Sequence, residues 1–88
     1  MTKVIDERVM KIYRDRIAYV ENSNVTVDVD RSLPTVSIEA PDAEGFFMQG
    51  DEAETFIAEA DRVYEELQEV SFDEACKAVA SPYADLMA

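Results

Sequence analysis

Two spacings of apolar residues follow one another along this chain and predict helices at both ends with strands between them. In residues 3–20 the apolar positions recur every three or four residues, which is the period of an amphipathic helix. The apolar face of this predicted helix consists of Ile5, Val9, Met10, Ile12, Tyr13, Ile17, Tyr19 and Val20. Arg16 falls in the middle of that face. Its side chain is therefore expected to extend outward or bond the last carbonyls of the helix, or else to pair with a carboxylate across the core.

The middle of the chain carries the two-residue alternation of half-buried strands. Residues 25–29 have valine at every second position, and residues 36–40 alternate in the same way after a turn at 31–34. These two segments predict an antiparallel hairpin with one apolar face. A second turn at 41–45 leads to a third predicted strand at 46–49.

Helical spacing returns at residues 51–70. Asp51 with Glu54 three residues later has the spacing of a capping box, so Asp51 is predicted to be the N-cap. The predicted apolar arc of this helix consists of Ala53, Phe56, Ile57, Ala60, Val63, Tyr64, Leu67 and Val70. One side of this helix is therefore expected to be buried.

A third helix is predicted after Ser71, because Ser71 and Glu74 repeat the capping-box spacing. Its apolar stripe consists of Phe72, Ala75, Cys76, Val79 and Ala80. Pro82 is expected to break or restart the helix, leaving one more turn at 83–88. The chain is predicted to be a single domain (1–88) of α+β class, with the order α-β-β-β-α-α. The fold would be a small antiparallel sheet of two or three strands packed with three helices, with helices on one face of the sheet.

Charged residues are distributed unevenly along the chain, and this distribution bears on which partners the protein can bind. The net charge is −12, from 20 acidic and 8 basic residues, and five of the basic residues lie in the first 16 positions. Such a surface is a poor partner for DNA or RNA, whose binding depends on cations that release phosphate counterions. It is equally unsuited to anionic membranes. Neither direct nucleic-acid binding nor membrane binding is expected.

The acidic residues of 51–70 collect on the side of the helix opposite its apolar arc. The candidate partner-binding residues are Asp51, Glu52, Glu54, Glu59, Asp61, Glu65, Glu66 and Glu69, with Arg62 alone among them. Over a helix of roughly 30 Å this is about one net charge per 4 Å, close to the ~3.4 Å spacing of charges on one DNA strand. The pattern predicts a face that engages a basic protein surface. A solvated outer face, or adaptation to salt, remains the alternative.

Little in the sequence supports catalysis or cofactor binding. The chain has no histidine, a single cysteine and only two glycines, which removes histidine-based triads, cysteine zinc sites and glycine-rich phosphate loops. Asp28, Asp30, Ser32 and Glu39 match EF-hand spacing, but Leu33 replaces the required glycine and the flanks alternate as strands do. No enzyme activity, metal or cofactor is expected.

The lone Cys76 lies on an apolar stripe and is expected to be a small buried hydrophobe. One unpaired thiol fits a reducing, cytoplasmic setting. The charged N-terminal segment does not have the form of a signal peptide, and no apolar run approaches the ~20 residues of a membrane span.

The C-terminal residues 78–88 have the sequence Ala-Val-Ala-Ser-Pro-Tyr-Ala-Asp-Leu-Met-Ala. This stretch of 11 of the 88 residues resembles the Ala-Val-Pro-Tyr-Ala-Asp-apolar-Met-Ala stretch of phage anti-restriction proteins that mimic DNA. Small size, strong acidity and scarce histidine are typical of the same group. The resemblance implies a phage-encoded, non-enzymatic inhibitor acting in the host cytoplasm. It assigns no role to any individual residue, and the basic first helix departs from an all-acidic mimic.

Three functions therefore remain open from the sequence. The first is an inhibitor that presents a DNA-like negative face to the nucleic-acid-binding surface of a host defence enzyme. The second is an acidic structural or oligomerising module, and the third is a regulator that binds a basic protein without mimicking DNA. The basic first helix and the acidic remainder also predict a homodimer that loosens near 1 M salt, because opposite patches attract between copies.

Overall fold

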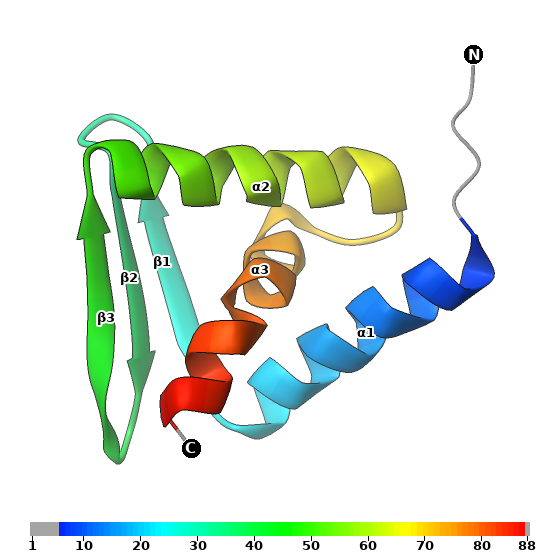
Figure 1. Cartoon of the computed structure of the whole chain (residues 1–88), viewed down its shortest axis with the longest axis horizontal. Coiled ribbons are helices and arrows are strands. Elements are labelled where there is room, and N and C mark those ends of the chain that lie inside the picture. Colours follow the sequence, from blue (N-terminus) through cyan, green and yellow to red (C-terminus); the bar gives the residue numbers. More distant parts are fainter. Residues whose placement is uncertain (1–5, 88) are drawn as a thin grey trace.

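The computed structural model describes residues 6–87 and contains three helices and one three-stranded antiparallel sheet. The elements are α1 (Glu7–Asn22), β1 (Thr26–Asp30), β2 (Thr35–Ala40), β3 (Ala43–Gln49), α2 (Asp51–Leu67) and α3 (Phe72–Met87). The predicted α+β class and the order α-β-β-β-α-α are confirmed. In Figure 1 the sheet stands at one end of the molecule, and α3 lies between α2 and α1.

Alternation along the strands separates the two faces of the sheet. Strand order is β1-β2-β3, and the registers Val27↔Ile38 and Val36↔Met48 bring buried side chains to the same face. Helices α2 and α3 pack on this face, whereas α1 packs mainly on α3. Three strands about 4.8 Å apart leave room for two helices about 10 Å wide, so the third helix packs beyond them.

Strand β3 begins at Ala43, three residues before the predicted start, and only residues 41–42 remain as a turn. The pairing shifts register between Ile38 and Ala40, opposite Gly45. A Cβ atom at Gly45 would lie 2.5 Å from the carbonyl oxygen of Ile38, so only glycine allows the strands to approach this closely. Gly45 was predicted to lie in the turn at 41–45, whereas in the structure it lies inside β3.

Helix α2 differs from its prediction at both ends. Its N-cap is Gly50, with φ of 63°, and no side chain caps the helix, so the prediction that Asp51 is the N-cap is wrong. The helix ends at Leu67 instead of residue 70, because Gln68 adopts a left-handed conformation and its N–H bonds the carbonyl of Tyr64. The predicted cap of α3 is confirmed: the Glu74 N–H donates to Ser71 Oγ and the Ser71 N–H donates to Glu74 Oε1, both at 3.1 Å.

Helix α3 continues through Pro82 to Met87, so the predicted break at Pro82 is wrong. A proline inside a helix loses one backbone hydrogen bond and costs about 3 kcal/mol. Burial on both sides of it offsets this cost, since Ala80 and Ala84 are buried in the core. Tertiary packing thus overrides a strong local signal.

The core has two parts, and they divide the predicted apolar arc of α2. Phe56 and Ile57 pack with the sheet, as predicted, but Leu67 joins a second cluster with Ile17 of α1 and residues of α3. Tyr64 was predicted to be in the core and is 46% exposed. Helix α2 extends past the sheet (Figure 1), so its last turns meet α3 instead of strands.

The apolar face of α1 is only partly covered. Ile17 and Val20 are buried and Met10 and Tyr13 are half-buried, as predicted, and Ile5 lies outside the described residues. The exposed members of the predicted face are Val9, Ile12 and Tyr19. The helix begins at Glu7, where the carboxylate of Asp6 accepts the Arg8 N–H at 2.8 Å.

Candidate functional site

Seven of the eight candidate carboxylates lie on the outer side of α2, and the eighth, Glu69, lies just beyond the end of the helix at Leu67. Six of the eight are exposed and two, Asp61 and Glu66, are half-buried. The exposed six are Asp51, Glu52, Glu54, Glu59, Glu65 and Glu69. The expected separation of buried and charged sides is therefore present. The eight carboxylates differ in their surroundings, however, because arginine side chains form ion pairs with some of them.

Asp61 is held by Arg31, which lies 30 residues earlier in the turn between β1 and β2. The two guanidinium nitrogens of Arg31 donate to the two carboxylate oxygens of Asp61 at 2.6 and 3.1 Å. These hydrogen bonds lower the pKa of Asp61 and raise that of Arg31. The guanidinium also lies 4.7 Å from the ring centre of Phe72 on α3. Asp61 therefore anchors the hairpin turn to α2 and α3.

Two further arginines balance charge on the same helix. Arg62 donates to Glu59 at 3.0 Å, one helical turn away, and its pKa is raised by this bond and by the charges of Glu59 and Glu66. Arg14 of α1 forms an ion pair with Glu69. The sequence placed Arg62 alone among the acids, whereas the folded chain adds Arg14 and Arg31 from distant segments. The later turns of α2 and the residues just after it are thus partly charge-balanced.

The remaining four carboxylates of the predicted face have no such partner. Within residues 6–87, no ion pair or side-chain hydrogen bond involves the carboxylates of Asp51, Glu52, Glu54 or Glu65. Three of these belong to the first turn of α2, where the helix dipole favours negative charge by about 0.3–1 kcal/mol per group. The strongest uncompensated negative charge of the helix therefore lies at its N-terminal end.

The outer face of the sheet adds carboxylates that the sequence analysis did not include in the site. Asp28 and Asp30 occupy the polar positions of β1, and Glu39 lies opposite Thr26 on β2. Hydrogen bonds from the Ser32 hydroxyl and backbone lower the pKa of Asp30. The alternation of apolar and polar residues along the strands is the sequence signal that could have placed these carboxylates on the outer face of the sheet. These acids lie across a β-hairpin, as the strand-like flanks of the EF-hand spacing predicted.

This outer face and the start of α2 meet at one end of the molecule. Asp30 pairs with Thr35 and Thr35 pairs with Gln49, the residue just before Gly50 and the start of α2. Two strand spacings place the backbone of Asp30 about 10 Å from that of Gln49. In Figure 1 the β1–β2 turn lies beside the first turn of α2. The uncompensated carboxylates therefore continue from the helix toward the outer side of the sheet.

Three further features of the described residues concern metal binding, the cysteine and the membrane. Among the described residues, no group of three or more metal-ligating side chains is close enough to hold an ion. Cys76 is 2% exposed, and burial raises the pKa of its thiol to about 12, which keeps it protonated at neutral pH. No helix in the described part of the chain is long and apolar enough to cross a membrane.

Comparison with known proteins adds no relative to this picture. No protein-family model, curated protein or solved structure matches this chain.

Proposed function

We propose that this chain is a non-enzymatic, phage-encoded inhibitor that presents a DNA-like negative face to the basic nucleic-acid-binding surface of a host defence enzyme. The contact surface is the first turn of α2 with Glu65, extended by the outer face of the sheet. The carboxylates paired with Arg14, Arg31 and Arg62 contribute less to binding, because their charge is already partly neutralised.

One observation carries this proposal: the carboxylates of Asp51, Glu52 and Glu54 are exposed and have no ion pair within residues 6–87. Exposed surfaces selected for solubility alone normally mix charges of both signs. Charges of both signs do mix farther along the same helix and just after its end, where arginines meet Glu59, Asp61 and Glu69. Its N-terminal end therefore differs from the rest of its own surface.

The spacing of these charges supports imitation of a phosphate backbone. Three carboxylates within the first four residues of a helix lie within about 5 Å along its axis, at least as dense as the ~3.4 Å spacing on one DNA strand. Such a surface is attracted to grooves lined by lysine and arginine, which increases the rate of association and suppresses wrong partners. The mechanism requires no chemical step, because occupying the groove excludes the nucleic acid.

The test is competition with DNA. The chain is immobilised, bacterial lysate is passed over it, and bound proteins are eluted with duplex DNA or with a neutral polymer at the same ionic strength. We expect a retained DNA-processing enzyme that duplex DNA releases. Retention should be lost in Glu52→Lys with Glu54→Lys and kept in the matched control Glu7→Lys with Asp42→Lys, which makes the same charge change at exposed positions away from this surface.

The outcomes separate the three functions. Retained protein that duplex DNA does not release would indicate a regulator without DNA mimicry. Equal loss of binding in both charge-reversal variants would show that total charge, and not this surface, governs retention. No retained protein at low salt would leave the acidic structural module as the better description and refute the proposal.

A further inference from the structure

Helix α1 carries an exposed stripe that the fold leaves uncovered. Val9, Ile12 and Tyr19 are 40%, 49% and 38% exposed, and Arg16 lies exposed between the last two. These four positions are spaced by three, four and three residues, so they form one continuous line along the helix. Most of the other apolar residues of α1 face α3 and are buried or half-buried. The stripe is therefore a second apolar surface on the same helix.

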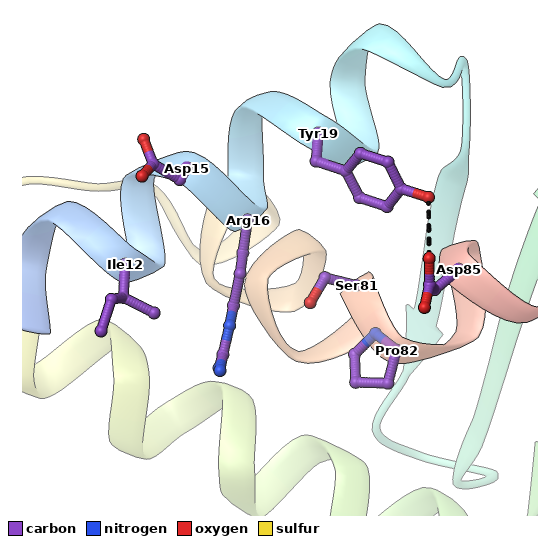
Figure 2. A pocket seen from close by; sticks show the side chains of 7 residues that line it. All are labelled: Ile12, Asp15, Arg16, Tyr19, Ser81, Pro82 and Asp85. Carbon is purple, nitrogen blue, oxygen red and sulfur yellow. Dashed lines mark hydrogen bonds between the residues drawn. The ribbon is translucent and has the colours of Figure 1, made fainter.

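A groove between α1 and α3 borders this stripe and extends it. The groove is shallow and open to solvent, has a volume of about 560 Å³, and is lined by Ile12, Asp15, Arg16, Tyr19, Ser81, Pro82 and Asp85. Figure 2 shows the Arg16 side chain extending between Ile12 and Pro82, with the Tyr19 hydroxyl directed at Asp85. That hydroxyl donates to the Asp85 carboxylate at 3.2 Å. Leu86, the next residue of α3, is 75% exposed. The apolar area thus spans two helices.

The intervals between the four stripe residues, three, four and three, are the same from either end of the helix. If a second copy of α1 is laid antiparallel on the first with the two-fold axis at the level of residue 14, Val9 faces the partner's Tyr19 and Ile12 faces the partner's Arg16. The stripe spans about 15 Å, close to three helical turns. A surface that meets itself under a two-fold rotation is the requirement for a symmetric dimer.

The charges beside the stripe complement one another under the same rotation. The Arg16 guanidinium lies 5.7 Å from the ring centre of Tyr13, and within residues 6–87 no carboxylate lies in ion-pair distance of it. The side chain of Asp15 is 66% exposed and its only partner there is Lys11, at 3.0 Å. The rotation brings Arg16 within about one helical turn of the partner's Asp15. Two reciprocal pairs of opposite charge thus form at the centre of the interface.

We propose that α1 forms a symmetric, antiparallel homodimer through the stripe Val9, Ile12, Arg16 and Tyr19, with reciprocal pairs between Arg16 and the partner's Asp15. The occupant is a second copy because both the palindromic spacing and the paired charges are properties of a surface that binds itself. An unrelated helix has no reason to match either one. The substitutions that test this dimer lie on α1, whereas those that test the inhibitor function by losing activity lie on α2.

The first test is sedimentation equilibrium at increasing protein concentration. We expect the mass of the parent to rise from 9.9 kDa toward twice that value between about 10 µM and about 1 mM, the range of a weak, low-area interface. Ile12→Lys should remain monomeric over the same range. Ala18→Lys makes a comparable charge change at an exposed position outside the stripe and should dimerise as the parent does.

The second test reverses the central charges. Arg16→Asp and Asp15→Arg should each raise the dissociation constant about tenfold, because like charges then meet at the axis. The double variant with both reversals restores opposite pairs and should return to within about threefold of the parent. This rescue is specific to an antiparallel contact, because a merely structural defect at either position would add to the other.

Salt distinguishes this interface from attraction between the basic and acidic patches of two copies. At 1 M salt the Debye length is about 3 Å, so contacts between patches are screened while apolar contacts persist. We expect this apolar dimer to remain at 1 M salt, in contrast to the dimer of opposite patches predicted from the sequence, which would loosen there. A monomer at every concentration, dissociation in high salt, dimerisation of Ile12→Lys, or failure of the double reversal to rescue would each overturn the proposal.

Discussion

Phe56 and Tyr64 are two aromatic residues on one helix, and the structure predicts that replacing them has very different effects. Both belong to the apolar arc expected from the sequence, two helical turns apart. Phe56 is 4% exposed and packs in the cluster formed with the sheet, with its ring 6.3 Å from that of Tyr83. Tyr64 is 46% exposed and its ring lies 6.3 Å from that of Phe72.

The expected magnitudes follow from burial. Phe56→Ala removes a fully packed ring and should lower the free energy of unfolding by about 3–5 kcal/mol. At about 0.05–0.15 kcal/mol per residue, a chain of 88 residues has a total stability of only about 4–13 kcal/mol. Tyr64→Ala loses one edge-on aromatic contact and partial burial, so its cost should be about 1 kcal/mol.

Urea unfolding followed by circular dichroism measures both values, with the slope of the transition checked for two-state behaviour. Because Tyr64 is a ring of similar size on the same helix, it is the matched control for Phe56. If Phe56→Ala unfolds within about 1 kcal/mol of the parent, or if Tyr64→Ala costs as much as Phe56→Ala, the placement of α2 against the sheet is wrong.

Two further predictions concern titratable groups. Because Arg31 lowers the pKa of Asp61 below its ordinary value of 3.8, the ionised pair stabilises the fold above about pH 4, and this contribution disappears as the pH falls through the lowered pKa. Asp61→Asn should therefore cost up to about 1 kcal/mol at pH 7, as expected for an exposed pair, and progressively less as the pH falls below about 4; a cost that does not decrease at low pH in urea titrations would contradict this. Burial raises the pKa of the Cys76 thiol to about 12, so a thiol-reactive dye at pH 8 should label the folded protein only at its rate of unfolding, and label it within seconds in denaturant. Fast labelling without denaturant would show that this part of the core is open.

The sequence by itself determined the type of each element. Spacing of two and of three to four residues reflects the geometry of a single strand or helix, so it needs no knowledge of distant segments. The same holds for the cap formed by Ser71 and Glu74, whose hydrogen bonds join residues three positions apart. Burial of Cys76 also follows from its position on an apolar stripe.

Only the tertiary structure decided which side chains meet. The pairs of Arg31 with Asp61 and Arg14 with Glu69 join residues 30 and 55 positions apart, so no local pattern could show that part of the acidic face is balanced. The structure also leaves Tyr64 exposed and carries a helix through Pro82. These outcomes depend on how whole elements pack, because many weak contacts between distant segments together outweigh a single local preference.

The two surfaces central to the function proposals illustrate the same division. The sequence predicted an acidic side of α2 and an apolar side of α1, since each is a periodic property of one helix. The width of the sheet, with room for two helices, decided that part of the apolar side of α1 stays exposed. The placement of three arginines decided that the uncompensated charge of α2 gathers mainly at its first turn. Periodicity assigns a face to a helix, and packing determines how much of that face remains free to bind.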